Sequence, residues 1–381
     1  MKKVFLMITI LMLTLSVFAQ TPATISAWTI QPTILPTGYE TQMAGAALIG
    51  DYLYIMGGNN NTDGDTAKCW KLFLEQYTGV LTQGVAATDL PTRDNFAYLN
   101  EGVAATADSI YITGGGYNSG SGAGPNRNNT TFIKAIGPEG ALAGAWTVST
   151  AFPSPYDPEL GGTAITENGY LVTFGGDSQS GSPVTYNSCY LAKIKPDGTL
   201  DAWLTGSTLP NAAWFAAACS VGDYVIAHLG ILDGMTNTNC TDKLYVAKVN
   251  SNGTMTAWTE QANKFSSARY NVALIAVNNT IFAIGGRISG NPPMDNVDRA
   301  TFDTGTGTLG AWTSTDAVLP TTLRYHAAVY SPKSKSIYVV SLRTPAGFMG
   351  EAYISSPLFT RPVPTPTPIP LGVEQKWHLF E

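Results

Sequence analysis

The feature that most constrains this chain is an internal repeat, whose successive anchor residues lie 54 to 62 positions apart. A fixed period in this range is typical of solenoids and propellers, in which each repeat forms one supersecondary unit. Most copies carry the dipeptide Ala–Trp, and Gly84 stands in the copy that has lost Trp. The anchors, in chain order, are Trp28, Gly84, Trp146, Trp203, Trp258 and Trp312. The repeat predicts six similar units.

A second motif in each repeat is an apolar strand that ends in Gly-Gly or in a remnant of that pair. The pairs lie at 57–58, 114–115, 175–176, 229–230, 285–286 and 341–342. Three residues before them stand Tyr54, Tyr111, Val172, Ile226, Phe282 and Tyr338. This arrangement resembles the kelch repeat, in which a second strand ends in Gly-Gly and an outer fourth strand carries Trp. The resemblance covers about residues 25–360 and implies a β-propeller.

The order of motifs also predicts how the ring closes. The chain enters at a fourth-strand motif, Ala27–Trp28, and its last repeat ends after a third-strand motif at 351–354. Pairing of these two strands would complete the sixth blade and remove the exposed edges of an open array. We therefore expect an all-β fold, a six-bladed β-propeller of four-stranded antiparallel blades closed by the N-terminal strand. An open solenoid with the same repeat is the alternative.

Residue size supports the same architecture. Small residues are frequent in the expected first strands, at 46–47, 104–105, 216–218 and 327–328, as required where six innermost strands crowd around one axis. The outer Trp of each blade supplies apolar area, on the order of 150–250 Å² per indole. We expect it to seal the contact with the neighbouring blade.

The two ends of the chain predict export and a tail. Lys2 and Lys3 precede an apolar stretch at 4–18, and Val17 and Ala19 occupy small-residue cleavage positions, so residues 1–19 are predicted to be a signal peptide. The stretch has 15 residues, whereas a spanning helix needs about 20; an uncleaved anchor is the alternative. The propeller would then occupy 20–360, followed by a Pro/Thr linker at 361–370 and a tail at 371–381, either a frayed end or a sorting tag.

These ends place the mature chain in the periplasm, on the cell surface or in the medium, with no membrane span after cleavage. Charged residues make up 13% of the chain, the net charge is −6, and no Lys/Arg cluster occurs, which excludes phosphate-backbone binding as an expected role. Nucleic acid is therefore not an expected partner, and we expect a monomer.

Four thiols in an oxidising compartment could form two disulfides in any of three pairings, namely among Cys69, Cys189, Cys219 and Cys240.

One face of the predicted propeller is more elaborate than the other. The turns between first and second strands are short, whereas the loops between second and third strands are long and rich in Gly, Asn and Ser. These loops lie at 59–68, 116–129, 177–187, 231–239 and 287–296. Loops on a rigid scaffold commonly carry binding residues, so we interpret the long-loop face as the ligand side. The alternative is that these loops are passive spacers.

Charged and aromatic residues gather where the fourth-to-first loops enter the axial channel. Alignment back from Gly-Gly places Arg269, Arg324, Glu159 and Glu40 near equivalent heights. Arginines facing a funnel suit a carboxylate, which they bind with two parallel hydrogen bonds, and aromatic rings suit sugar faces. The predicted ligand-binding residues are Arg93, Arg269, Arg287, Arg324, Trp214, Tyr270, Tyr325 and His326. The alternative is that Arg and Glu pair across neighbouring blades and hold the ring together.

Metal and cofactor sites are not expected. Asn59, Asn61, Asp63 and Asp65 have the oxygen spacing of a calcium loop, but Trp70 stands where the bidentate Glu should be. We interpret this segment as a turn. The hydrolase elbow, the zinc-protease motif and the phosphate loop are all missing from the sequence.

The sequence therefore favours a non-enzymatic binding or interaction module that recognises a carbohydrate or a protein through its long-loop face. One enzymatic alternative is a sugar-ring epimerase or mutarotase, resembling the exported kelch-like N-acetylneuraminate epimerase. In that case Glu159 or Glu40 would act as the base and Arg269 would hold a carboxylate. A purely structural surface module is the third hypothesis.

Overall fold

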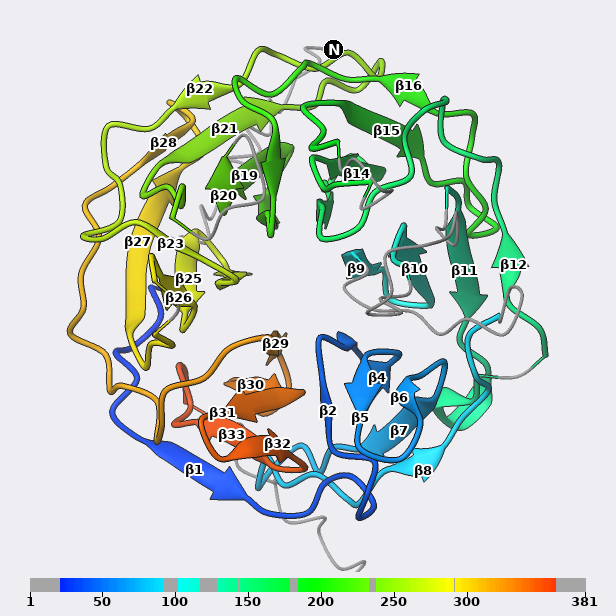
Figure 1. The fold of residues 1–381 in the computed structure, drawn as a ribbon, viewed down its shortest axis with the longest axis vertical. Coiled ribbons are helices and arrows are strands. Elements are labelled where there is room, and N and C mark those ends of the chain that lie inside the picture. The colour runs from blue at the N-terminus through cyan, green and yellow to red at the C-terminus, as the bar shows by residue number, and fades with distance from the viewer. Residues whose placement is uncertain are drawn as a thin grey trace, which may run out of the picture.

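A computed structural model describes residues 21–91, 102–116, 129–142, 144–178, 184–232, 238–290 and 292–360. The predicted signal peptide, linker and tail lie outside these ranges. Within them the chain is all-β, and six four-stranded antiparallel sheets stand as blades around a central axis (Figure 1). The fold class predicted from the repeat is confirmed.

We number the blades in chain order by their innermost strands and give each from the inside outward. They are β3 (Gly45–Ile49), β4 (Tyr52–Met56), β7 (Cys69–Phe73) and β8 (Val85–Ala86) in blade 1; β9 (Gly102–Ala105), β10 (Ser109–Thr113), β11 (Thr131–Ala135) and β12 (Thr147–Val148) in blade 2; β13 (Gly162–Ile165), β14 (Tyr170–Phe174), β15 (Cys189–Lys193) and β16 (Leu204–Thr205) in blade 3; β18 (Ala217–Val221), β19 (Tyr224–His228), β21 (Leu244–Lys248) and β22 (Thr259–Glu260) in blade 4; β24 (Ala273–Val277), β25 (Thr280–Ile284), β27 (Val297–Asp303) and β28 (Thr308–Leu309) in blade 5; and β29 (Ala327–Ser331), β30 (Ser336–Val340), β33 (Ala352–Ser355) and β1 (Trp28–Gln31) in blade 6.

The first strand of the chain closes the ring, as the motif order predicts. β1 pairs antiparallel with β33, from Trp28 opposite Ser355 to Gln31 opposite Ala352. Each innermost strand contacts the next around the axis, including β29 with β3 across the chain ends. The alternative of an open solenoid is therefore wrong, because no blade lacks a neighbour on either side.

The segment before β1 is also tied to blade 5. The carboxylate of Asp316 accepts a hydrogen bond from the backbone N–H of Ile25 and lies 3.1 Å from the guanidinium of Arg299. Arg299 in turn donates to the carbonyl of Pro22 and to the hydroxyl of Thr24. Residues 22–31 therefore bridge blades 5 and 6.

The outer Trp residues of blades 2, 3, 4 and 6 hydrogen-bond to the preceding blade. In blade 5 the indole N–H of Trp312 makes no hydrogen bond to a described residue, and its ring packs against Phe265 instead. The indole N–H of Trp258 donates to the carbonyl of Ser207, which follows the fourth strand of blade 3. Equivalent hydrogen bonds run from Trp28 to Ala317, from Trp146 to Thr88 and from Trp203 to Thr150. In blade 1 the backbone N–H of Gly84 donates to the carbonyl of Ile34 instead. The predicted sealing role of these anchors is confirmed, and backbone replaces side chain where Trp is lost.

Tyrosines in the second strands bind in the opposite direction around the ring. The buried hydroxyl of Tyr54 donates to the carbonyl of Gly140 in blade 2, at 2.7 Å. Tyr111 reaches Gly198 in blade 3, and Tyr338 reaches Gly79 in blade 1. Each of these tyrosines thus satisfies a carbonyl in the next blade while its ring packs in the core.

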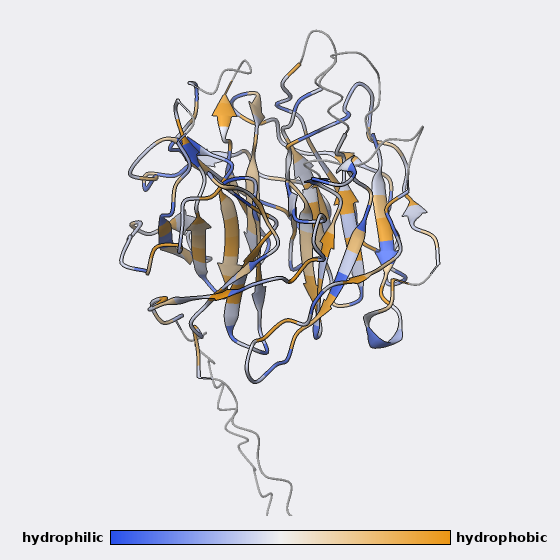
Figure 2. Cartoon of the chain, turned by 60° about the horizontal axis from the view of Figure 1, so that its bottom comes forward, coloured by the Kyte–Doolittle hydropathy of each residue, from blue (hydrophilic) through white to orange (hydrophobic). Residues whose placement is uncertain are grey.

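Close approach around the axis explains the small residues of the innermost strands. A Cβ atom at Gly102 in β9 would lie 2.1 Å from Oγ1 of Thr163 in the neighbouring β13, far inside van der Waals contact. Hydrophobic residues lie along the strands of the blades (Figure 2), and their buried side chains cluster between neighbouring sheets. The axis is therefore narrow, and the core is divided among the six blade interfaces.

On the long-loop face the chain forms a second layer of short ladders. In the five blades whose entry segment is described, that segment pairs with the start of the long loop of the same blade. Examples are β2 (Thr41–Gln42) with β5 (Asn59–Asn60), β17 (Ala213–Trp214) with β20 (Ile231–Leu232), and β23 (Arg269–Tyr270) with β26 (Arg287–Ile288). β6 (Gly64–Asp65) extends the first ladder, and β31 (Leu342–Thr344) pairs with β32 (Gly347–Met349) within one loop. This layer holds the base of the long loops rigidly.

All four cysteines are free thiols in this structure, so none of the disulfide pairings open to the sequence is present. Cys69, Cys189 and Cys219 are buried, and burial raises the pKa of the Cys189 and Cys219 thiols to about 12. Across the described ranges, no helix has the length and apolar character needed to cross a membrane.

The tyrosine hydrogen bonds between blades can be tested by removing one hydroxyl. We predict that Tyr54→Phe lowers the free energy of unfolding by about 1–3 kcal/mol, because it leaves the buried carbonyl of Gly140 without its donor. Urea denaturation measures this. Tyr77→Phe, at a tyrosine that is 42% exposed, serves as the control and should change stability by less than about 0.5 kcal/mol. Equal stability of the two variants would contradict the assignment.

Candidate functional site

The mouth of the axial channel on the long-loop face is built from one repeated turn. In five blades the residue two positions before the first strand has a positive φ near 55°. These residues are Met43, Leu160, Phe215, Asn271 and Tyr325, with φ between 53° and 59°. Positive φ is uncommon for residues with a side chain and is strained for bulky ones. Because the same conformation recurs in every described copy, the turn belongs to the fold. The side chains that it presents differ, and they determine the chemistry of the mouth.

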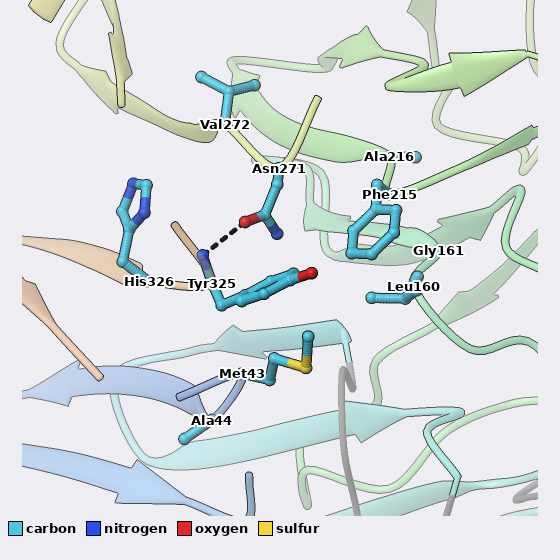
Figure 3. A pocket seen from close by; sticks show the side chains of 10 residues that line it. All are labelled: Met43, Ala44, Leu160, Gly161, Phe215, Ala216, Asn271, Val272, Tyr325 and His326. Carbon is cyan, nitrogen blue, oxygen red and sulfur yellow. Dashed lines mark hydrogen bonds between the residues drawn. The ribbon is translucent and has the colours of Figure 1, made fainter. Parts of the chain in front are cut away.

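These residues line a cavity of about 150 Å³, together with the residues that follow them: Ala44, Gly161, Ala216, Val272 and His326. Figure 3 shows their side chains converging from separate blades, with the Tyr325 ring lying below Phe215 and Asn271. The backbone N–H of Tyr325 donates to the side-chain oxygen of Asn271. The described lining residues are all uncharged at neutral pH, so the cavity itself is a neutral, mixed polar and apolar site.

Aromatic rings form one wall beside this cavity. Phe215 packs against Trp214 at 4.6 Å, against Tyr270 at 5.4 Å and against Tyr325 at 6.1 Å between ring centroids. The rings come from blades 4, 5 and 6 and form one buried cluster with Leu160 and Ile231. The structure therefore brings three of the predicted ligand-binding aromatics together.

Three arginines lie next to this aromatic wall, and we call Arg287, Arg324 and Arg343 the arginine cluster. Arg287 donates to the hydroxyl of Tyr325 at 2.7 Å, and its guanidinium lies 5.4 Å from the ring centroids of both Tyr270 and Tyr325. Arg324 lies 5.5 Å from the Tyr325 ring. The backbones of Arg324 and Arg343 hydrogen-bond to each other, and Arg343 donates to the side chain of Gln42 at 2.9 Å.

The positive charges of the arginine cluster repel one another. Burial lowers the pKa of Arg324, and the positive charges of Arg287 and Arg343 lower it further. Among the described residues, neither Arg324 nor Arg343 forms an ion pair with an Asp or Glu. The cluster is therefore a concentration of positive charge at the edge of a neutral cavity.

Arg269 takes a different position from the one expected. Its side chain is 1% exposed and pairs with Asp298 of the same blade at 2.6 Å. The guanidinium also stacks on Phe265 at 3.9 Å, and Ser314 donates to the second oxygen of Asp298. Burial lowers the pKa of Arg269 while Asp298 raises it. Arg269 does not line the cavity, and its contacts are those of a residue that holds blade 5 together.

Neither of the two candidate bases, Glu159 and Glu40, is among the residues that line the cavity. Glu159 is fully buried, and its backbone pairs in both directions with that of Asp177. Glu40 is partly exposed and accepts a hydrogen bond from the backbone N–H of Gly38. The described residues therefore do not bring Arg269 and a carboxylate together at one cavity, which is what the epimerase hypothesis needs.

Histidines contribute neutral rings. His326 lines the cavity, and Nε2 lies 3.0 Å from the carbonyl of Ile284. Burial lowers its pKa to about 4. His228 is likewise buried and has a pKa lowered to about 4, mainly by burial. At neutral pH neither ring adds charge to the mouth.

The segment with calcium-like spacing forms a compact turn. The side-chain oxygen of Asn60 accepts hydrogen bonds from the backbone N–H groups of Thr62 and Asp63. Asp63 accepts hydrogen bonds from Asn60 and Thr66. Within the described part of the chain, no group of three or more His, Cys, Asp or Glu is placed to hold a metal ion.

Sequence reasoning missed Arg343, and Arg93 lies outside the described residues. Arg343 follows the degenerate pair Ser341–Leu342 in the way that Arg287 follows Gly285–Gly286. Reading the position after each Gly-Gly pair, rather than the entry loops alone, would have identified it.

Neither a protein-family model nor a curated protein matches this chain.

The structural role of Arg269 can be tested by stability. We predict that Arg269→Met lowers the free energy of unfolding by about 3–5 kcal/mol, because it leaves the carboxylate of Asp298 buried without its counter-charge. Replacing both partners, in Arg269→Met with Asp298→Leu, should recover most of this loss. Urea denaturation measures both.

The control is Lys195→Met, which breaks an exposed pair with Asp201 at 3.7 Å and should cost about 1 kcal/mol or less. A cost for Arg269→Met no larger than that of the control would show that the buried pair is not structural.

Proposed function

We propose that this chain is an exported, kelch-like propeller that works as a non-catalytic binding module, with its ligand site at the axial mouth of the long-loop face. The ligand class is carbohydrate or protein. The observation that carries the proposal is the cavity of about 150 Å³ flanked by aromatic rings and by the arginine cluster. Pockets that combine apolar walls with a few placed polar groups are characteristic ligand sites.

The difference between the two faces of the propeller also supports placing the ligand site on the long-loop face. On the opposite face, the first and second strands are joined by tight turns such as 50–51 and 278–279. The long-loop face carries the second layer of ladders, which fixes the entry residues and the bases of the long loops in one frame. A rigid frame lowers the entropic cost of ordering a binding surface.

The chemistry at the mouth favours binding over catalysis. The described lining residues offer neither a carboxylate nor a nucleophile paired with a base, and His326 is held neutral by burial. Acid–base catalysis needs such a group within reach of the substrate. The order of Trp and Gly-Gly motifs supports the kelch-like assignment, and the N-terminal sequence supports export.

A glycan array probed with the chain from residue 20 onward tests the proposal. We expect binding to a restricted set of glycans, and we expect Tyr325→Ala to weaken it about tenfold or more, because Tyr325 both lines the cavity and holds Arg287. Tyr77→Ala, in the hairpin on the opposite face, is the matched control and should bind as the parent does. Silence across the array, or equal loss in both variants, would count against a carbohydrate site at this mouth.

A further inference from the structure

We propose that the arginine cluster binds the carboxylate of an acidic sugar, a uronic acid unit, whose ring occupies the axial cavity. This inference rests on the proposed function and specifies its ligand. It starts from the mutual repulsion of the like charges on Arg287, Arg324 and Arg343 and adds the geometry that joins the cluster to the cavity.

The first step concerns the electrostatic repulsion within the arginine cluster when no ligand is bound. Arg324 feels the charges of both Arg287 and Arg343, and like charges held close together destabilise one another. No described acidic residue pairs with Arg324 or Arg343. An anion placed among these guanidinium groups would relieve the repulsion, so the cluster favours an anionic ligand.

The second step is that the guanidinium groups are held in place before a ligand arrives. Arg287 is 5% exposed and is fixed by the hydroxyl of Tyr325 and by two aromatic rings. Arg343 is fixed by Gln42 and lies 5.2 Å from the ring of Phe348. Each guanidinium has five N–H donors, and Arg343 uses one nitrogen for Gln42. Among the described residues, the guanidinium of Arg324 donates to none.

The third step links the cluster to the cavity through one residue. The ring of Tyr325 lines the cavity, while its hydroxyl accepts the hydrogen bond from Arg287 and its face lies near Arg324. In Figure 3 the Tyr325 ring extends toward Leu160 and Phe215, with Asn271 above it and Met43 below it in the view. A ligand ring in the cavity would therefore lie within reach of the arginine cluster.

The fourth step concerns size and polarity. A cavity of about 150 Å³ has the size that accepts one six-membered ring. Its lining is neutral and mixes apolar groups with the amide of Asn271 and the backbone of the entry turns. Aromatic and apolar walls suit the C–H face of a sugar ring, and polar groups suit its hydroxyls. The charge is provided outside the cavity, where an exocyclic carboxylate would project.

Isothermal titration calorimetry on the chain from residue 20 onward tests this proposal with three probes: galacturonate, galactose and acetate. We expect galacturonate to bind about tenfold or more tightly than galactose, since the two sugars differ only in the group that faces the arginines. Acetate should bind more weakly than galacturonate, because it leaves the cavity empty. Raising the salt concentration from about 50 to about 500 mM should weaken galacturonate binding severalfold.

The variant Arg324→Gln should weaken galacturonate binding about tenfold and leave galactose binding unchanged. Lys195→Gln removes the same charge from the opposite face and is the matched control. Because Arg324 is partly exposed and its side chain makes no hydrogen bond to another described residue, the fold should persist, and the unfolding temperature of the variant checks this.

The possible outcomes distinguish a wrong ligand assignment from a wrong proposed function. Equal binding of galactose and galacturonate would overturn the carboxylate assignment while leaving a carbohydrate-binding function in place. Acetate binding as tightly as galacturonate would overturn the sugar assignment and reduce the cluster to a non-selective anion site. An oligo-aspartate peptide, titrated as a fourth probe, represents an acidic protein ligand. Its binding without binding of either sugar would overturn the carbohydrate proposal as a whole.

Discussion

The pairing of β1 with β33 is the constraint on which the rest of the structure depends. It joins residues more than 300 positions apart in the chain and completes blade 6, so that β29 contacts β3 and the ring has no open side. Closing so long a loop costs conformational entropy, which the backbone ladder and the contacts of residues 22–31 with blade 5 offset. The candidate site shares this dependence. Arg287 belongs to blade 5, Arg324 and Arg343 to blade 6, and Gln42 to the entry of blade 1.

Neighbouring blades are joined by two sets of hydrogen bonds that run in opposite directions. Trp side chains of four blades donate back to the preceding blade, and second-strand tyrosines of three blades donate forward to the next one. Both use a side chain that is largely apolar with one polar tip, so each contact buries area and satisfies a carbonyl at once. The blades are therefore fixed in position around a narrow axis. Because the entry turns on the long-loop face are attached to the blades, their positions are fixed as well.

Sequence was sufficient for the fold because its signals repeat. The order of the motifs at Trp28 and 351–354 predicts that the N-terminal strand closes the ring. The intact Gly-Gly pairs mark the ends of the second strands, and their glycines have positive φ. The site was harder to predict, because alignment at the mouth must be correct to one residue. The turn between the first two strands has two residues in blade 5, 278–279, but four in blade 6, 332–335. Counting back from Gly-Gly places Arg269 16 residues before Gly285 and Arg324 17 residues before Ser341, so the two arginines fall at nearly the same height. The ladders instead pair Tyr270 with Arg287 and Arg324 with Arg343, so Tyr270 is the counterpart of Arg324. That offset separates a buried structural arginine from one at the mouth.

Hydrogen exchange of the whole chain, followed by mass spectrometry, tests the central role of closure most directly. If β1 completes the ring, its amides should open only when the domain unfolds, and peptides covering 28–31 should exchange at the same slow rate as peptides covering β30 and β33. Fast exchange of 28–31 with continued protection of the other strands of blade 6 would contradict the account, because the ring and its mouth would then persist without the N-terminal strand.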